Sequence, residues 1–449
     1  MDERLPTQRL EGFCYSIELA GNTTVIVEND NILLDVSRLV WRAWGGKLPT
    51  GIDRTCLAYV EHFGCRSQAV VQRGSSTLVL PADDSKRLFD LLLSPGRDFK
   101  SKLARLLATG FFFRRRGDLS GYLYLNVGHT GLDKPGHAEW VRRTGVRPFY
   151  FVHDLIPLTH PEYCRPAEPE KHLRRMTALL QLGAGIIANS RETLNELAVF
   201  AGLQQSLDMP PAIVAPLGVR SDPHRSKASK HIQLPGRPYF VMLGTIEGRK
   251  NHLLMLNIWS EMARRLGTGC PQLVVIGQRG WESEQAVDML DRSEEIRGHV
   301  IELSRCDDAQ LHAYMANARA LLFPSFVEGY GLPLVEALAA GTPVIASNLS
   351  VFRELAGEIP DYLSPIDGLG WSQMIEAYAL ENSPARAAQL GRLAGWRTPT
   401  WQDHFGGVDR WLEQFGPAVP SSATPGFAAP DGPAVSLSPA LQRVRGASE

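Results

Sequence analysis

Short apolar runs that alternate with helical patterns are the feature that most constrains how this chain folds. Such alternation is typical of parallel strands joined by crossover helices, so we predict an α/β protein. In the first half, the predicted strands are 31–37, 67–73, 122–127, 148–154, 185–190 and 212–218. After a charged, proline-containing stretch that begins at residue 220, they are 239–245, 272–277, 300–303, 320–325 and 343–347. The pattern therefore predicts two Rossmann-like halves.

The restart of the pattern divides the chain into domains, which its 449 residues favour because one hydrophobic core rarely holds so many. We predict an N-terminal domain over 1–222 and a C-terminal domain over 223–395. A helix over 396–415 is expected to pack back on the first domain. The tail, 416–449, is rich in Pro, Ala, Ser and Gly and is predicted to be disordered.

Charge and cysteine content exclude several classes of protein. Lys and Arg number 47 against 48 for Asp and Glu, so no global field would recruit nucleic acid. The six cysteines include no CxxC pair, which argues against a zinc cage and against a secreted disulfide framework. The N-terminus has no apolar core of a signal peptide, and no stretch approaches the roughly 18 to 20 uncharged apolar residues of a membrane span. We therefore expect a cytoplasmic protein.

The segment from Glu328 to Gly341 carries the most chemistry. It follows a predicted buried strand, and glycines at 329 and 331 permit a tight turn before an apolar helix. This order places a helix N-terminus at the carboxyl end of a strand, where free N–H groups and the helix dipole favour a phosphate. Glu328 and Glu336 could then accept hydrogen bonds from sugar and ribose hydroxyls. The alternative is that Glu328 caps the helix and Glu336 is a solvated surface residue.

A pair of cations follows the predicted strand at 239–245, in the sequence GTIEGRKNH. Arg249 and Lys250 would lie at the carboxyl end of that strand, the edge at which open α/β sheets bind ligands. A departing nucleoside diphosphate needs such positive charge, because negative charge grows on it in the transition state. The alternative is two basic residues on a solvated loop.

These two segments together resemble the family 4 retaining glycosyltransferases of the GT-B fold, also called glycosyl transferases group 1. The first matches E-G-F-G-L-P-x-x-E-A-x-A-x-G except at Tyr330, and the second matches G-T-x-E-x-R-K-N. Residues 48–54 also resemble the early glycine loop of that family. The resemblance implies two Rossmann-like domains, with mainly parallel sheets, that face a central cleft. It also implies that the domain over 1–222 binds the acceptor and the domain over 223–395 binds the nucleotide sugar. The donor-site residues that it implies are Gly51, Gly244, Thr245, Arg249, Lys250, Gly277, Glu328, Gly329, Tyr330, Gly331, Leu332 and Glu336.

The same resemblance implies an activity. A hexosyl group would pass, with retention of anomeric configuration, from a nucleotide diphosphate sugar to a hydroxyl of a glycan or lipid-linked oligosaccharide in the synthesis of cell-surface polysaccharide such as lipopolysaccharide. Glu336 would bind the ribose and Glu328 the donor sugar, and GDP-mannose is the preferred donor. We expect no cofactor and no obligatory metal, because Arg249, Lys250 and the helix end supply the positive charge.

His153 and Asp154 end the predicted strand 148–154 and are the candidate acceptor-side residues. The pair could bind acceptor hydroxyls or accept a proton. Their sequence, V-H-D-x-I-P, resembles the acceptor-domain motif of the family, whereas the alternative is a histidine held by hydrogen bonds for structural reasons. The candidate catalytic residues are therefore His153, Asp154, Glu328, Arg249 and Lys250.

Residues 97–116 form a basic amphipathic stretch, with seven Arg or Lys against one Asp. Such a stretch can lie on anionic lipid, here at the inner face of the cytoplasmic membrane. The alternative is a surface helix that buries its apolar side against the protein.

Four rival functions use a similar architecture. Sugar-nucleotide epimerases and phosphorylases also have two Rossmann-like domains, and a non-catalytic adaptor could keep the fold. A dehydrogenase is disfavoured because no G-x-G-x-x-G follows a strand with an acidic residue about 20 positions on. An adaptor would not need Glu328, Glu336, Arg249 and Lys250 together.

Overall fold

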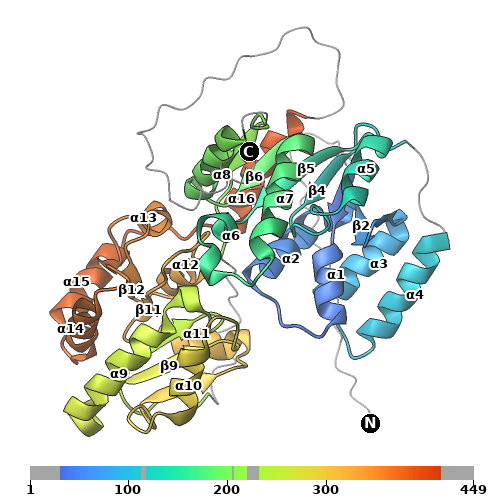
Figure 1. Ribbon diagram of the computed structural model, residues 1–449. Coiled ribbons are helices and arrows are strands. Elements are labelled where there is room, and N and C mark those ends of the chain that lie inside the picture. The colour runs from blue at the N-terminus through green and yellow to red at the C-terminus, as the bar shows by residue number, and fades with distance from the viewer. Residues whose placement is uncertain (1–30, 113–117, 205–206, 220–231, 416–449) are drawn as a thin grey trace, which may run out of the picture.

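The computed structural model describes residues 31–112, 118–204, 207–219 and 232–415, which form two α/β domains (Figure 1). The predicted domain boundary at residue 222 and the predicted disordered tail over 416–449 lie outside these residues. All eleven predicted strands are present within the described part of the chain.

The N-terminal domain contains a seven-stranded sheet in the order β3-β2-β1-β4-β5-β6-β7. Its neighbouring strands are parallel except for the pair β2–β3. That hairpin was not predicted, and it turns through Gly74, whose φ of 59° suits glycine. The strands are β1 (Ile32–Asp35), β2 (Ser67–Arg73), β3 (Ser76–Val79), β4 (Leu123–Asn126), β5 (Arg147–Val152), β6 (Gly185–Ala188) and β7 (Ala212–Val214).

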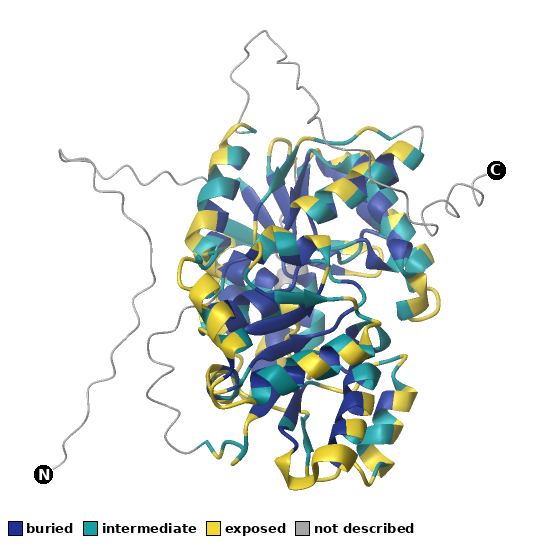
Figure 2. Cartoon of the chain, turned by 90° about the vertical axis from the view of Figure 1, so that its left-hand side faces the viewer, coloured by how far each residue is buried: buried dark blue, intermediate teal, exposed yellow. Residues whose placement is uncertain are grey.

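The C-terminal domain contains a six-stranded parallel sheet in the order β10-β9-β8-β11-β12-β13. The edge strand β13 was not predicted, because Pro360 and Asp361 interrupt its apolar run. The strands are β8 (Tyr239–Leu243), β9 (Gln272–Ile276), β10 (Val300–Leu303), β11 (Leu321–Phe323), β12 (Val344–Ser347) and β13 (Asp361–Leu363). The central strands are buried along their length, as strands covered by helices on both faces should be (Figure 2).

Helices connect the strands of both sheets. Those of the N-terminal domain are α1 (Ser37–Trp44), α2 (Gly51–Phe63), α3 (Ala82–Leu93), α4 (Phe99–Phe112), α5 (Pro135–Thr144), α6 (Ile156–Thr159), α7 (Glu168–Leu182) and α8 (Arg191–Leu203). Those that follow are α9 (His252–Leu266), α10 (Glu284–Arg292), α11 (Asp308–Ala316), α12 (Leu332–Ala339), α13 (Ser350–Ala356), α14 (Gly368–Ala379), α15 (Pro384–Leu393) and α16 (Trp401–Glu413). The helix that begins at Gly51 is thus the second of its domain.

The last helix, α16, crosses from the C-terminal domain to the N-terminal sheet (Figure 1). The ring of Trp411 contacts that of Phe149 on β5, with 5.5 Å between the ring centroids. Gly185 on β6 makes room for it, since a Cβ there would lie 2.6 Å from the Trp411 ring. His404 Nε2 lies 3.0 Å from the hydroxyl of Tyr59. The chain therefore ties its two domains together a second time after the linker.

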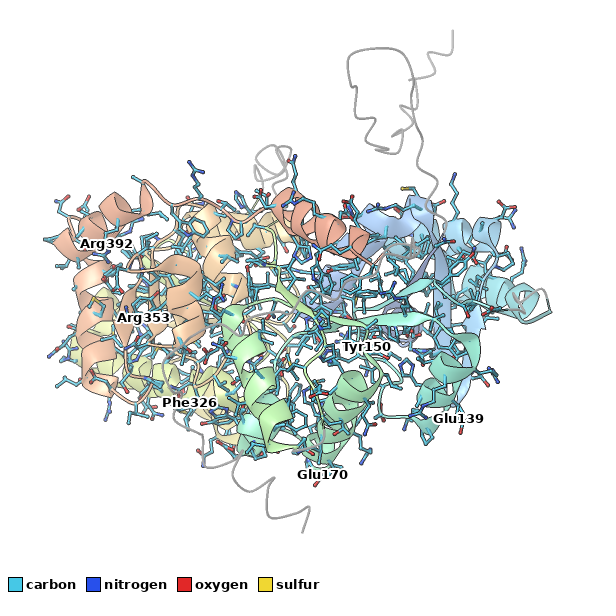
Figure 3. All side chains as sticks on the ribbon, turned by 90° about the horizontal axis from the view of Figure 1, so that it is seen from above. Glu139, Tyr150, Glu170, Phe326, Arg353 and Arg392 are labelled. Atoms are coloured by element: carbon cyan, nitrogen blue, oxygen red, sulfur yellow. The ribbon has the colours of Figure 1, made fainter. Side chains whose placement is uncertain are left out.

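Buried residues form the interior of each domain, and charged residues lie at its periphery. Figure 3 shows Tyr150 inside the N-terminal domain, with Glu139 and Glu170 at the periphery. The basic helix α4 follows the same rule, because Phe99 and Leu103 are buried whereas Lys100 and Lys102 are exposed. Its described part therefore buries an apolar side against the protein, as the alternative interpretation held; Arg114, Arg115 and Arg116 lie outside the described residues. No helix in the described ranges is both long and apolar enough to cross a bilayer.

Candidate functional site

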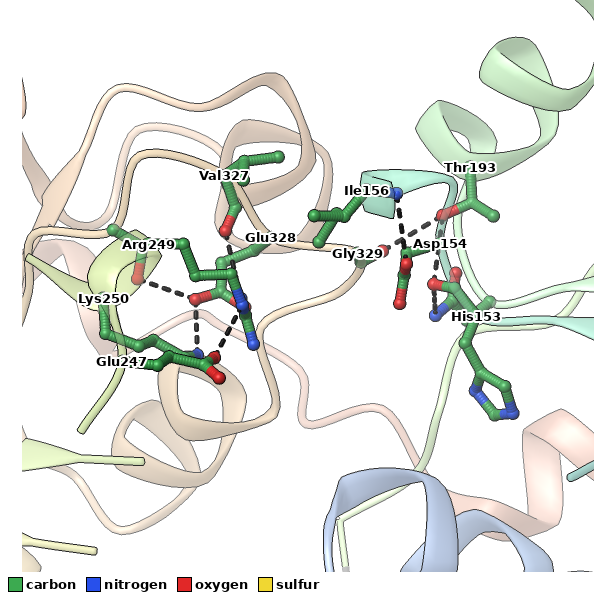
Figure 4. Close-up of polar contacts among 12 residues, drawn as sticks. His153, Asp154, Ile156, Thr193, Glu247, Arg249, Lys250, Val327, Glu328 and Gly329 are labelled. Carbon is green, nitrogen blue, oxygen red and sulfur yellow. Dashed lines mark hydrogen bonds and ion pairs between the residues drawn. The ribbon is translucent and has the colours of Figure 1, made fainter. Parts of the chain in front are cut away.

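A cluster of four charged side chains lies at the carboxyl edge of the C-terminal sheet. Strands β8 and β11 are neighbours, so the loops that follow them meet. Arg249 places Nη1 2.7 Å from Glu328 Oε2 and Nε 2.7 Å from Glu247 Oε1. Lys250 places Nζ 2.5 Å from Glu328 Oε1 (Figure 4). The fold thus joins the two sequence segments that were predicted to share one site.

The cluster is largely buried, and its formal charges cancel. Only 7% of the Glu328 side chain and 10% of the Lys250 side chain are exposed. Burial by itself would raise the pKa of Glu328, but the charges of Arg249 and Lys250 lower it to about 2. Burial and the neighbouring Arg249 lower the pKa of Lys250, while burial raises that of Glu247. Glu328 is therefore a fully ionised carboxylate at neutral pH.

Glu328 does not cap the helix that follows it. The N-cap position of α12 is Gly331, with a φ of 116°, and the side chain of Glu328 turns instead toward the cations. Ser325 also donates a hydrogen bond to Glu328 Oε1 over 2.7 Å. The alternative in which this carboxylate serves only as a cap is therefore wrong, and its orientation is fixed by three donors from two loops.

Two helix N-termini, one from each domain, face this edge of the sheet. Helix α12 begins at Leu332, and helix α2 begins at Gly51. A Cβ on Gly51 would lie 3.1 Å from Leu332 Cδ1, so the two ends are in contact distance of one another. Each end presents N–H groups and the positive end of a helix dipole. Between them the geometry favours an anionic group such as a phosphate.

Glu336 lies on α12 and pairs with a residue of the other domain. Arg54 on α2 places Nη1 2.8 Å from Glu336 Oε1, and its Nη2 lies 3.7 Å from Asp308 Oδ1. The Glu336 side chain is 24% exposed, so it is neither fully solvated nor sealed off. A ribose that binds Glu336 must therefore share this carboxylate with Arg54 or displace the Arg54 guanidinium.

Three further predicted donor-site residues shape the backbone beside Lys250. Gly244 has a φ of 141°. A Cβ on Gly277 would lie 1.8 Å from the carbonyl oxygen of Gly244, so the loops after β8 and β9 touch through their backbones. Thr245 packs its methyl group toward the next turn, 2.6 Å from where a Cβ on Gly280 would stand. These positions hold the loop of Lys250 close to the sheet.

The turn after Glu328 touches the predicted acceptor-side motif. The carbonyl of Gly329 accepts a hydrogen bond from the hydroxyl of Thr193 over 3.1 Å (Figure 4). A Cβ on Gly329 would lie 2.5 Å from the carbonyl oxygen of His153 and 2.6 Å from Asp154 Cβ. The fold therefore places His153 and Asp154 beside the turn that carries Glu328, although more than 170 residues separate them in sequence.

The side chains of this motif are engaged within the N-terminal domain. His153 is 5% exposed, and its Nε2 lies 2.7 Å from the carbonyl oxygen of Val127. Burial lowers the pKa of His153 to about 4, so the ring is neutral at pH 7. Asp154 Oδ1 accepts a hydrogen bond from the backbone N–H of Ile156 at the start of α6. Figure 4 shows the His153 ring directed away from Gly329, so the contact with the turn is made by its backbone.

Tyr330 also faces the N-terminal domain. Its side chain is 5% exposed, and its hydroxyl donates a hydrogen bond over 2.9 Å to the carbonyl of Leu217. Any contact that Tyr330 makes with a bound sugar donor must therefore come from its backbone. The hydrogen bond is one that phenylalanine, the usual residue of the resembling motif, cannot make.

Glu247 of the charged cluster and Ser325, which donates a hydrogen bond to it, were not singled out from the sequence. Glu247 stands inside the motif G-T-x-E-x-R-K-N, so a signal for it was present. Ser325 stands three positions before Glu328, in the loop after β11, and no sequence signal distinguishes it from any other buried serine. Within the described ranges, no group of three or more His, Cys, Asp or Glu side chains is arranged to hold a metal ion.

Comparison with known proteins agrees with this geometry. Residues 225–359 match the sequence profile described as "Glycosyl transferases group 1". The chain is 27% identical over 240 residues to the serotype-specific mannosyltransferase WbdA of Escherichia coli, covering 50% of this chain and 29% of that protein. It is 33% identical over 171 residues to the O-antigen chain mannosyltransferase B of E. coli, covering 38% of this chain and 44% of that protein. The match thus spans less than half the length of either relative.

Solved structures share the architecture. HepE of Anabaena, solved with UDP and glucose, superimposes with a TM-score of 0.60 at 15% identity, over 85% of this chain and 99% of that one. At this level of identity the similarity establishes the fold, which is GT-B.

Proposed function

We propose that this chain, a group 1 glycosyltransferase with the GT-B fold, transfers a mannosyl group from GDP-mannose, with retention of configuration, to a hydroxyl of a glycan or lipid-linked oligosaccharide. The observation that supports this most directly is the contact of Gly329 with His153 and Asp154. It brings the charged cluster of one domain to the carboxyl edge of the other sheet, so a donor and an acceptor could meet at one place.

In this proposal the nucleoside diphosphate lies at the facing N-termini of α2 and α12, with its ribose on Glu336. Arg249 and Lys250 stabilise the charge that develops on the departing diphosphate. Each carboxylate oxygen accepts about two hydrogen bonds. Oε1 of Glu328 already has Lys250 and Ser325 as donors, whereas Oε2 has Arg249. Glu328 can therefore accept one further hydrogen bond, from a single hydroxyl of the donor sugar, through Oε2.

We propose mannose as the transferred sugar because the two relatives from E. coli are named mannosyltransferases. The structural neighbour HepE was solved with UDP and glucose, so the fold by itself does not select one nucleotide sugar. The acceptor would be a growing polysaccharide, as the O-antigen chain is for one relative. The proposal assigns the enzyme to the cytoplasm, where a nucleotide-sugar donor would be available to it.

The experiment is a screen of GDP-mannose, UDP-glucose, a dTDP-sugar and an ADP-sugar with the full chain, read by binding and by release of the nucleoside diphosphate. Glu336→Ala and Lys250→Ala should each abolish transfer while circular dichroism stays unchanged. The matched controls, Glu284→Ala and Lys86→Ala, change exposed residues and should retain activity. Activity retained by both site variants would refute the site, and absence of sugar-nucleotide binding would favour an adaptor.

Peripheral contact with the membrane through residues 97–116 belongs to the proposal as an electrostatic contact. Burial of Phe99 and Leu103 leaves these side chains unable to insert into lipid while α4 is folded. The exposed Lys100 and Lys102 could still approach anionic headgroups. Sedimentation with anionic vesicles, compared between the wild type and Lys100→Gln/Lys102→Gln, tests this, and equal sedimentation would remove it.

A further inference from the structure

An open pocket of about 240 Å³ lies in the N-terminal domain, formed by residues outside the charged cluster. Trp41 of α1 lines it together with Gln72 and Arg73, which end β2, and with Thr130, Gly131 and Lys134, which follow β4. Strands β1 and β4 are neighbours, and the connection after β1 leads to β2 on one side of the sheet whereas the connection after β4 leads to β5 on the other. The pocket therefore lies at the carboxyl edge of the sheet, at its topological switch point, where open α/β sheets bind ligands.

The floor of the pocket is built from a fixed network. Gln72 Nε2 lies 2.6 Å from Asp35 Oδ2, 2.8 Å from the hydroxyl of Tyr124 and 3.2 Å from the carbonyl oxygen of Thr130. Gly131 has a φ of 80°, and a Cβ there would lie 2.3 Å from Gln72 Oε1. The loop after β4 thus rests directly on the Gln72 amide, which a larger residue at 131 would prevent. The shape of the pocket is set before any ligand arrives.

One wall carries an oriented guanidinium. Trp41 donates a hydrogen bond from Nε1 to the carbonyl of Gln72 over 2.7 Å, which fixes the indole. The guanidinium carbon of Arg73 lies 5.2 Å from the centroid of that ring, within the range of a cation–π contact. A guanidinium held in this way loses less freedom when it binds an oxyanion than one on a free side chain.

The opposite wall adds an ammonium group. Lys134 Nζ lies 3.3 Å from Asp133 Oδ2, but the other oxygen of Asp133 lies 3.6 Å from Arg175. The buried Asp133 therefore divides its charge between two cations, while the Lys134 side chain stays 54% exposed. Arg73 and Lys134 thus both line the same pocket, while the carboxylate of Asp133 is shared between Lys134 and Arg175.

The pocket is connected to the proposed reaction centre by one loop. That loop leaves β4 at Val127, whose carbonyl accepts the hydrogen bond from His153, and reaches the pocket at Thr130 to Lys134. The ring of His129 on this loop lies 5.2 Å from the ring of His153. The loop that lines the pocket therefore also packs against the strand end that carries His153.

We propose that this pocket binds a phosphoryl group carried by the acceptor. The role of that molecule as acceptor rests on the proposed function. The planar guanidinium of Arg73 can meet two oxygens at once, and the ammonium of Lys134 can meet a third as a point charge, which together suit a tetrahedral oxyanion. Two sources have this chemistry, a soluble sugar phosphate and the diphosphate of a lipid-linked glycan.

The test is isothermal titration of the full chain with mannose 6-phosphate and, separately, with farnesyl diphosphate. Each titration is run with the donor site occupied by whichever of GDP and UDP the chain binds. The variant Arg73→Gln/Lys134→Gln should weaken binding of the preferred probe roughly tenfold or more, because two charge-assisted contacts are lost. The control variant Lys86→Gln/Arg142→Gln removes two exposed charges of the same domain and should leave binding unchanged. The affinity of Arg73→Lys for the probe should fall between those of the wild type and the double variant, since lysine keeps the positive charge but lacks the planar guanidinium.

Binding of mannose 6-phosphate alone would assign a soluble acceptor, and binding of farnesyl diphosphate, alone or with it, a lipid-linked one. Binding of neither probe to the wild type, or equal binding to both double variants, would overturn the proposal. The affinity for GDP and UDP is measured on the same proteins and should be the same in all of them. If the wild type binds neither nucleotide, the proposed function fails, whereas a loss of phosphate binding confined to the pocket variant still supports the anion site. If the double variant does not fold, each single variant is titrated in its place.

Discussion

Replacing Glu328 with glutamine should destabilise the C-terminal domain strongly at neutral pH and much less in acid. The pKa of Glu328 falls from 4.5 to about 2 because Arg249 and Lys250 favour its ionised form over the cost of burial. That difference corresponds to about 3 kcal/mol of preference for the carboxylate in the folded protein. Glutamine has the shape of the neutral acid, so Glu328→Gln should lower the free energy of unfolding by about that amount at pH 7.

The direction of the pKa shift determines how the stability difference changes with pH. The folded pKa lies below the unfolded one, so the stabilisation is complete above about pH 5 and is lost as the pH falls toward 2. The difference between the wild type and Glu328→Gln should therefore shrink to less than half its neutral value at pH 3.

Urea unfolding followed by tryptophan fluorescence at pH 7 and pH 3 measures this difference. The domain supplies the reporters, because Trp259 and Trp371 are fully buried in it. The control is Glu261→Gln, which removes the charge of a half-exposed pair with Arg265 and should change the stability little at either pH. A loss below about 1 kcal/mol at pH 7, or a loss that is the same at both pH values, would refute the account of a carboxylate held by two cations.

Two further predictions concern the contact between the domains. Gly329→Ala should lower kcat/KM for sugar transfer at least tenfold while circular dichroism stays unchanged, because the new Cβ would meet the carbonyl oxygen of His153 at 2.5 Å; a variant with normal kcat/KM would show that this contact is dispensable. Tyr330→Phe should lower the free energy of unfolding by about 1 kcal/mol, the typical value of one hydrogen bond, here the bond to Leu217. An unchanged midpoint of urea unfolding would mean that water replaces it.

The fold was predictable to a large extent because its signals are local. Each buried strand of a doubly wound sheet appears as an apolar run of its own, so the strands of both halves could be placed from the sequence. The hairpin strand β3 and the edge strand β13 could not, because polar residues take up part of each: β3 begins with Ser76 and Thr77, and β13 begins with Asp361. The helix at Ser37–Trp44 was overlooked because it follows β1 without a loop that would mark its start.

The site was predictable only in its parts. Glu328, Arg249 and Lys250 could be chosen as residues, but their charge balance with Glu247 depends on two loops whose distance in space no local pattern records. The pocket at Arg73 and Lys134 was not anticipated at all, because its walls come from α1, β2 and the loop after β4.

The sequence by itself determined the α/β class, the two domains and the chemical groups of the donor motif, since these depend on periodicity and on short motifs. Only the tertiary structure decided how those groups act on one another. It paired Glu328 with both cations, set Glu336 against Arg54 of the other domain, and turned the ring of His153 away from Gly329. The physical reason is that pKa values and contacts depend on distance and burial, which arise only when segments far apart in the chain pack together.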